Sequence, residues 1–220
     1  MLPLHDDQRS RRFPFATILI IAANVAVFCD WQLRVGIEKS VFEWGLTPST
    51  FLNSSWLPGM AHMVSSMFLH GGWMHLIGNM WFLFVFGKNV EGAVGAVRFL
   101  FFYVLCGIAA DYLYVLFSPA SRIPLVGASG AISGVLGAYL ALYPRASITT
   151  LAPFFYSLRL PAWFFLIVWF GLQILYQAAA SSRGHHGGDV AYLAHIGGFV
   201  AGLILIVFFK NRVDSVRSNA

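Results

Sequence analysis

The sequence predicts an all-α integral membrane protein, a bundle of six transmembrane helices with a long interfacial first loop and both termini in the cytoplasm. Composition is the first reason: 58% of the 220 residues are hydrophobic and 10% are charged, whereas about a quarter of a soluble domain is charged. The second is length, because several apolar stretches reach the roughly 17 to 25 residues that cross a bilayer as a helix. The third is that basic residues stand singly at the ends of these stretches.

Six apolar stretches are the expected spans, and prolines mark the breaks between the later ones. In chain order they are Pro14–Phe28, Trp73–Phe86, Ala96–Phe117, Ala128–Leu142, Leu160–Gln177 and Val190–Phe209. The first follows three arginines, as a signal peptide would, but no small-residue cleavage site comes after it, so a retained span is expected. The chain then divides into an N-terminal cytoplasmic tail (1–13), a membrane core (14–209) and a C-terminal cytoplasmic tail (210–220).

The basic residues predict the orientation, because cytoplasmic loops of membrane proteins are rich in Lys and Arg. With six spans and a cytoplasmic N-terminus, ten of the fourteen lie inside: Arg9, Arg11, Arg12, Lys88, Arg98, Arg145, Arg159, Lys210, Arg212 and Arg217. Outside lie Arg34, Lys39, Arg122 and Arg183. The net charge is +5, but the basic residues form no stripe on one face, so no nucleic-acid partner is expected.

The first outer connection, from Asp30 to Gly71, is long and carries Trp31, Trp44 and Trp56. Tryptophan favours the membrane–water boundary, so this loop is predicted to lie on or partly in the lipid interface. An ordinary solvated loop is the alternative.

Three clusters of polar residues stand within predicted spans, where unsatisfied polar groups cost several kcal/mol. They run from His70 to Asn79, from Gly127 to Gly134 and from Ala194 to Gly202. Spans two, four and six all run from outside to inside, and each cluster lies in the outer part of its span. The three clusters are therefore expected to meet at one depth near the outer surface.

Small residues repeat every fourth position in spans four and six, at Gly130, Gly134 and Ala138 and at Ala194, Gly198 and Gly202. Such repeats let two helices approach closely in lipid. They are also common in membrane helices that have no catalytic role. Ser129 and His195 adjoin the outer ends of these faces, so close helix contact would bring their side chains within hydrogen-bond reach.

A serine and a histidine in this arrangement suggest acyl-transfer chemistry. Ser129 is the candidate nucleophile and His195 the candidate base, because a hydroxyl attacks only when a neighbouring base takes its proton. Asp111 and Asp189 are the nearest acidic residues, but neither lies in a motif, so a dyad is predicted. His75 and Asn79 share one helical face and, with the Ser129 backbone N–H, would form an oxyanion hole. For Asn79 a polar clasp between helices is the alternative, and His70 is interpreted as an anchor of the preceding loop.

Metal and aspartate mechanisms are not expected. A site built from His70, His75, His185 and His186 lacks recognisable ligand spacing, and the chain has neither His-Glu-x-x-His nor Gly-x-Gly-Asp. No metal or cofactor is therefore predicted. The Gly-rich segment Ser181–Asp189 is predicted to form a mobile cap over the site.

The three clusters together resemble the rhomboid family of intramembrane serine proteases. The motifs are Gly-x-Ser-Gly at Gly127–Gly130, His-x-x-x-Asn at His75 and Asn79, and Ala-His-x-x-Gly at Ala194–Gly198. The resemblance implies a six-helix fold, with Ser129 and His195 as catalytic dyad and His75, Asn79 and the Ser129 amide as oxyanion site. His70, Gly127, Gly130, Gly198 and Gly202 would be structural supports. It also implies a first loop embedded sideways and a fifth span that gates substrate access.

One residue departs from the family pattern. Some members place an aromatic ring one turn after the nucleophile, against the histidine; Ser133 stands there instead, so another group must hold the imidazole. Ser133 is also the alternative nucleophile, one turn deeper.

The predicted function is hydrolysis of peptide bonds in or beside transmembrane segments, with single-pass membrane proteins and the lipid bilayer as partners. The alternatives are an inactive relative that binds membrane clients, and a small transporter. A bacterial inner membrane, with the site opening to the non-cytoplasmic side, is the expected location. Substrate identity and oligomeric state are not determined by the sequence.

Overall fold

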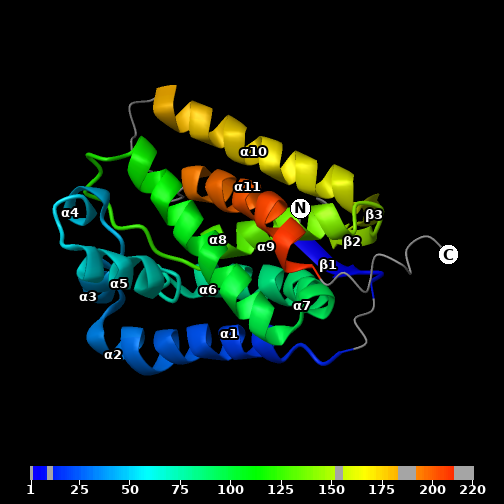
Figure 1. Ribbon diagram of the computed structural model, residues 1–220, viewed down its shortest axis with the longest axis horizontal. Coiled ribbons are helices and arrows are strands. Elements are labelled where there is room, and N and C mark those ends of the chain that lie inside the picture. The colour runs from blue at the N-terminus through cyan, green and yellow to red at the C-terminus, as the bar shows by residue number, and fades with distance from the viewer. Residues whose placement is uncertain (1, 9–11, 152–155, 183–191, 211–220) are drawn as a thin grey trace.

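Helices dominate the protein, whose computed structural model describes residues 2–8, 12–151, 156–182 and 192–210 (Figure 1). The helices are α1 (Phe15–Ala26), the π-helical turn η1 (Val27–Gln32), α2 (Leu33–Val35), α3 (Ile37–Trp44), α4 (Pro48–Phe51), α5 (Trp56–Ser66), α6 (Trp73–Phe82), the π-helical turn η2 (Leu83–Gly87), α7 (Lys88–Val94), α8 (Ala96–Phe117), α9 (Ser129–Leu142), α10 (Ala162–Ser182) and α11 (Tyr192–Phe209). The strands are β1 (Leu2–Asp6), β2 (Ser147–Leu151) and β3 (Ser157–Pro161).

Four helical segments in the described part of the chain are long and apolar enough to cross a membrane. They are Phe15–Val35, Ala96–Phe117, Ala162–Ala179 and Tyr192–Phe209, and they match the first, third, fifth and sixth predicted spans. The second predicted span lies in the continuous helical stretch formed by α6, η2 and α7. The fourth corresponds to α9, which is apolar but has 14 residues. The chain is thus a mostly helical membrane protein.

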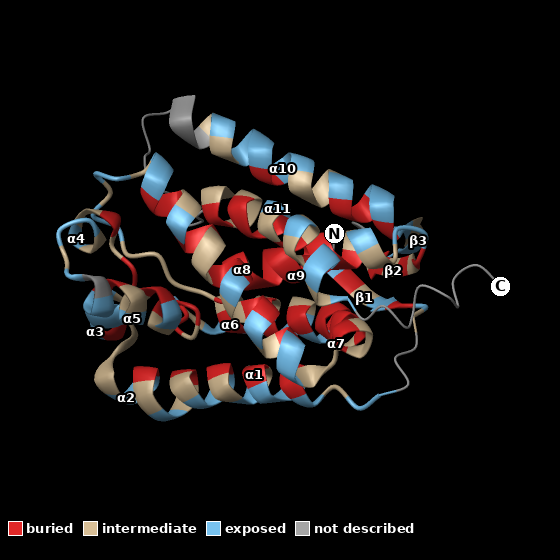
Figure 2. Cartoon of the chain, in the orientation of Figure 1, coloured by how far each residue is buried: buried red, intermediate tan, exposed pale blue. Residues whose placement is uncertain are grey.

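Helix α9 lies at the centre of the molecule, and every residue from Gly130 to Tyr139 is buried (Figure 2). At about 1.5 Å per residue it spans roughly 21 Å, less than a bilayer core. Because neighbouring helices surround it, α9 does not need to reach both lipid surfaces. Its first residue, Ser129, directly precedes this buried run.

Helices α9 and α11 touch through their small residues, as the sequence predicts. A Cβ added at Gly198 would overlap the backbone carbonyl of Gly130, and one added at Gly202 would overlap that of Gly134. Only glycine permits so close an approach of two backbones. This contact confirms the predicted pairing of spans four and six.

Helix α1 is capped by a side chain from elsewhere in the chain. The Glu91 carboxylate accepts the backbone N–H groups of Ala16 at 3.0 Å and Thr17 at 2.8 Å, and the Thr17 hydroxyl at 2.7 Å. First-turn N–H groups have no acceptor within their own helix. This buried carboxylate satisfies them and joins α1 to α7.

The long first loop is mostly helical, with α3, α4 and α5 packed at one end of the molecule (Figure 1). It exposes large apolar side chains, which are Leu33, Phe42, Trp44, Leu52, Leu57 and Val64. Such a surface is typical of a segment that contacts lipid. The interfacial location of the loop stays a prediction that this apolar surface favours.

A three-stranded antiparallel sheet corrects the all-α prediction. Residues Leu2–Asp6, expected as part of a tail, pair with β2 in a register that matches Leu2 to Leu151, and β2 pairs with β3. The Asp6 carboxylate fixes this strand to the bundle. It accepts hydrogen bonds from Tyr139 and Asn89, and Lys88 Nζ lies 3.6 Å away.

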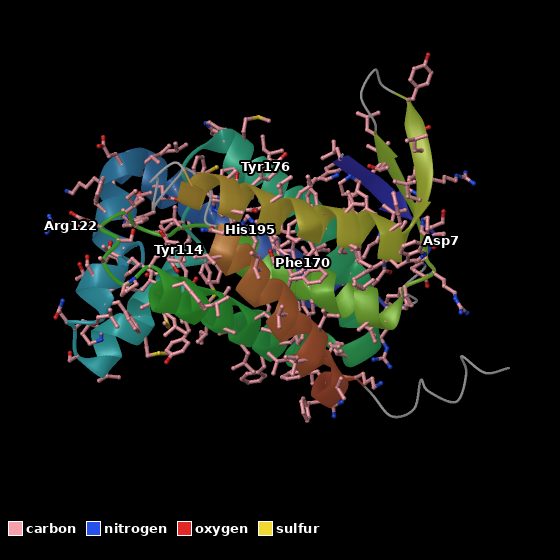
Figure 3. All side chains as sticks on the ribbon, turned by 90° about the horizontal axis from the view of Figure 1, so that it is seen from above. Asp7, Tyr114, Arg122, Phe170, Tyr176 and His195 are labelled. Atoms are coloured by element: carbon pink, nitrogen blue, oxygen red, sulfur yellow. The ribbon has the colours of Figure 1, made fainter. Side chains whose placement is uncertain are left out.

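The sheet lies at the opposite end of the molecule from the first loop. Figure 3 shows Asp7, beside the sheet, at one end and Arg122 at the other. The N-terminal strand and Arg122 therefore lie far apart, and the side of the membrane on which each stands stays a prediction. Most of the predicted cap (183–189) and most of the C-terminal tail (211–220) lie outside the described residues.

Candidate active site

Ser129 and His195 are in direct contact. His195 Nε2 lies 2.8 Å from Ser129 Oγ, a hydrogen-bond distance. Ser129 is the first residue of α9, and His195 lies in the first turn of α11. The glycine contact between these two helices determines the distance between their N-terminal ends, so two residues 66 positions apart meet.

The second ring nitrogen of His195 contacts Gln173 of α10, a residue that the sequence analysis did not identify. Gln173 Oε1 lies 2.9 Å from His195 Nδ1, and Gln173 Nε2 donates to the Trp169 backbone carbonyl at 3.2 Å. The Trp169 ring also lies near the imidazole, with centroids 6.1 Å apart and planes inclined by 33°. Gln173 is therefore the group that holds the imidazole, through its Nδ1 edge, where the sequence analysis named no partner.

Ser133 and Asp111 have other partners. The Ser133 hydroxyl donates to the Ser129 backbone carbonyl at 2.7 Å, within its own helix. Asp111 accepts a hydrogen bond from Ser66 at 3.2 Å. Among the residues that the structure describes, no carboxylate is hydrogen-bonded to His195; Asp189 lies outside them.

His75 and Asn79 stand together beside Gly127, as the i, i+4 spacing predicts. Gly127 has φ +120° and its missing Cβ would lie 2.7 Å from His75 Nε2 and 3.6 Å from Asn79 Nδ2. A larger residue would therefore be strained and would displace the histidine. The Gly127 N–H donates to the Ser66 carbonyl at 2.8 Å, which holds this turn in place just before Ser129.

The two side chains present donors at this point. His75 Nδ1 accepts a long hydrogen bond of 3.4 Å from the Gly71 N–H, so the proton of the neutral ring is on Nε2. Asn79 Nδ2 is buried and has no acceptor among the described residues. The first backbone N–H groups of α9 also have no acceptor within the helix. Together these donors surround the space beside Gly127 and the start of α9.

His70 differs in detail from the expected anchor. Its backbone N–H donates to Gln32 Oε1 at 2.9 Å, and Gln32 Nε2 donates to the His70 carbonyl at 3.2 Å. The ring itself is fully buried, makes no hydrogen bond within the described chain, and lies edge-on to His75 with centroids 5.1 Å apart. Burial, with a smaller effect from His75, lowers the pKa of His70 to about 3. The loop is thus anchored through the His70 backbone by Gln32.

Metal-ligating side chains do not gather in the described part of the chain, where no group of three or more His, Cys, Asp or Glu side chains could hold an ion. His185 and His186, considered in the sequence analysis, lie outside the described residues.

A mostly helical membrane protein with a serine and a histidine hydrogen-bonded between its central helices is the class that these observations define. The family model for the Rhomboid domain matches residues 58–212, which include every polar cluster of the site. The chain belongs to the rhomboid family.

Known proteins of similar sequence carry the same family name. The chain is 28% identical over 202 residues to Rhomboid protein 1, mitochondrial, of Saccharomyces cerevisiae, covering 90% of this chain and 54% of the relative. It is 28% identical to Rhomboid-like protein 11, chloroplastic, of Arabidopsis thaliana, covering 91% and 68%. It is 32% identical over 152 residues to Rhomboid-like protease 5 of Toxoplasma gondii, covering 66% and 16%.

The chain spans about half the length of the yeast relative. The names of the yeast and Arabidopsis relatives place those proteins in mitochondria and chloroplasts. The expected bacterial inner membrane receives no support from these names; integral membrane location is supported by the family and by the apolar helices.

Proposed function

We propose that the protein is an intramembrane serine endopeptidase that uses a Ser129–His195 dyad. The observation that carries this proposal is the 2.8 Å contact between Ser129 Oγ and His195 Nε2. The rhomboid family includes proteases, as the name of the Toxoplasma relative states, and also inactive members. An inactive member would be expected to lack one of the two groups or their contact.

The dyad would work in two stages. Ser129 Oγ attacks the scissile carbonyl carbon while its proton passes to His195 Nε2, and His195 then protonates the departing amine as the C–N bond breaks. Water next attacks the acyl-enzyme, its proton passes to His195, and the ester bond to Ser129 breaks as the hydroxyl is reprotonated. The same imidazole is base and acid in turn.

The negative charge of each tetrahedral intermediate would be held beside Gly127. The donors there are His75 Nε2–H, Asn79 Nδ2 and the Ser129 N–H. The positive end of the α9 dipole faces the same position and also favours a negative charge. The unpaired, buried state of Asn79 Nδ2 supports this role, because a donor without an acceptor in a buried site is costly unless a ligand supplies one.

The substrates would be transmembrane proteins, with cleavage in or near a single-pass segment. The polar site within an apolar bundle and the apolar surface of the first loop support this class. We also propose that the α6–α7 stretch and α9 complete six crossings, with both termini in the cytoplasm and the site nearer the opposite surface.

Cleavage of a single-span reporter by the purified protein tests the function. Wild type should cleave the reporter and react with a fluorophosphonate, whereas Ser129→Ala and His195→Ala should do neither. Ser133→Ala is the matched control: it removes a neighbouring hydroxyl that is bonded within its own helix, and should stay active. Reporter cleavage that persists in both dyad variants would refute the proposal.

A further inference from the structure

The orientation of the Gln173 amide is determined by its neighbours. Gln173 is buried in α10, and one end of its amide faces the Trp169 backbone carbonyl at 3.2 Å while the other faces His195 Nδ1 at 2.9 Å. A backbone carbonyl oxygen can only accept a hydrogen bond, so the amide nitrogen must face Trp169. The amide oxygen, Oε1, therefore faces His195.

This orientation selects one tautomer of His195. Oε1 can only accept, so Nδ1 must carry the ring proton. Nε2 then has its lone pair directed at Ser129 Oγ, 2.8 Å away, which is the arrangement needed to take the hydroxyl proton. The opposite tautomer would place two lone pairs against each other at Gln173 and leave no acceptor for the serine proton.

We propose that Gln173 is the positioning residue of the dyad, and that helix α10 thereby holds His195 in its reactive tautomer and orientation. This inference rests on the proposed peptidase function. It assigns to an uncharged amide the part that a carboxylate has in a Ser-His-Asp triad. The described chain has no carboxylate at that position, and Ser133 bonds within its own helix.

Because Gln173 belongs to α10, the position of that helix controls the base. Helix α10 lies at the outside of the bundle (Figure 1), and many of its large side chains are exposed: Trp163, Phe164, Ile167, Leu172, Ile174, Leu175 and Tyr176. It meets α11 through aromatic rings: Phe170 is stacked on Phe199 with ring centroids 4.6 Å apart, and the Tyr176 and Tyr192 rings are tilted to each other with centroids 5.5 Å apart. Figure 3 shows Phe170, Tyr176 and His195 close together along this contact. Displacement of α10 would remove the acceptor from His195, so the base is complete only while α10 is packed on α11.

Two substitutions at one position separate this role from simple packing. Gln173→Met keeps the size of the side chain and removes the acceptor, whereas Gln173→Glu keeps an acceptor and adds a charge. Positioning predicts that kcat for the reporter falls by about 10- to 1,000-fold in the methionine variant, with KM changed less than about 2-fold. The glutamate variant should retain more activity than the methionine variant. Packing alone predicts the opposite order, because a buried charge is costly and methionine is not.

The rate of fluorophosphonate labelling gives a second readout that needs no transmembrane substrate, and it should fall in parallel with kcat. Leu172→Met, which places methionine at the neighbouring exposed position of α10, should match wild type. Folding is checked by thermal unfolding in detergent. If the methionine variant does not fold, Gln173→Leu takes its place. Positioning then predicts a higher kcat for Gln173→Glu than for Gln173→Leu, and packing alone predicts the reverse.

The outcomes distinguish the two proposals. Wild-type protein that neither cleaves nor labels would overturn the peptidase function. Wild-type activity that depends on Ser129, together with a kcat for Gln173→Met within 2-fold of wild type, would overturn the positioning role alone. So would a methionine variant more active than the glutamate variant.

Discussion

At the scale of single residues, the site combines two hydrogen bonds of His195 with a buried donor, on Asn79, that has no acceptor within the described chain. Ser129, His195 and Gln173 form a continuous hydrogen-bonded row, while Asn79 Nδ2 is buried with no acceptor among described residues. A ground state with a prepared but unused donor is typical of a site that stabilises charge formed later.

Replacement of Asn79 tests this interpretation. Asn79→Ala should lower kcat by about 10- to 100-fold, because one donor to the oxyanion is lost, and should leave fluorescence-detected unfolding little changed. Asn53→Ala, an exposed asparagine bonded to Ser49 in the first loop, is the matched control. Unchanged turnover in Asn79→Ala would instead favour a polar clasp between helices.

His70 should make stability depend on pH. Its pKa is lowered by burial to about 3 in the folded protein, against about 6.5 when unfolded. The folded state therefore prefers the neutral ring, so the contribution is complete above pH 6.5 and is lost as the pH falls below that value. Between pH 7 and 5 the loss should reach roughly 1 to 2 kcal/mol.

Denaturant unfolding of wild type and His70→Phe in detergent would measure this difference. The phenylalanine keeps a ring against His75 and removes the titration, so the two unfolding free energies should converge or cross as the pH is lowered. Parallel curves would show that another group is responsible.

The sequence predicts most of the site because its polar residues are rare in an apolar chain. Ser129, His195, His75 and Asn79 all lie in short motifs, and the structure brings them to one region. Gln173 was missed for a physical reason: a single glutamine in an apolar span is a costly group that needs a partner, but Gln177 one turn later gives the same signal. Only the packing of α10 on α11 shows which of the two meets His195.

At the scale of elements, the contact of α9 with α11 sets the distance between Ser129 and His195, the proposed nucleophile and base. Gly198 has no space for a Cβ, since one would overlap the Gly130 carbonyl. A side chain at this position would push α9 and α11 apart, and Ser129 would then move away from His195 by about the same distance as the two helices.

Gly198→Val should therefore abolish both reporter cleavage and fluorophosphonate labelling and destabilise the fold by about 1 to 3 kcal/mol. Gly171→Ala is the matched control, because nothing lies within 4 Å of a Cβ at Gly171. That variant should stay active and change the unfolding free energy by no more than about 1 kcal/mol. An active, stable Gly198→Val protein would contradict the close-contact argument.

The elements that the sequence did not predict are the strands. Leu2–Asp6 pairs with Ser147–Leu151, and no local pattern can indicate a partner some 145 residues away. Strand pairing here depends on where α9 ends and where α1 begins. Helices are set by local apolar length and are predicted well; Ala96–Phe117 has the predicted bounds.

At the scale of the whole molecule, the sheet and the segment around Arg122 lie at opposite ends (Figure 3). Asp6, Lys88, Asn89 and Tyr139 gather at the sheet end, while Arg122 lies at the other end (Figure 3).

Topology reporters would decide the orientation. Green fluorescent protein fused after Ala220 should fluoresce, and alkaline phosphatase fused at the same position should be inactive, because both results mark the cytoplasm. Phosphatase inserted after Arg122, between α8 and α9, should be active. Active phosphatase at the C-terminus would place that end outside the cytoplasm and would refute the proposed topology.

The pairing of β1 with β2 also has a consequence for biogenesis. Residues 2–6 leave the ribosome before the segment 147–151 to which they bind has been made. At about 5 to 20 residues per second, the first strand waits roughly 7 to 30 seconds for its partner. During that interval its edge is unpaired, and a factor that binds nascent chains has time to hold it. Completion of this sheet would then be a late step of assembly, after the helices that precede β2 have been inserted.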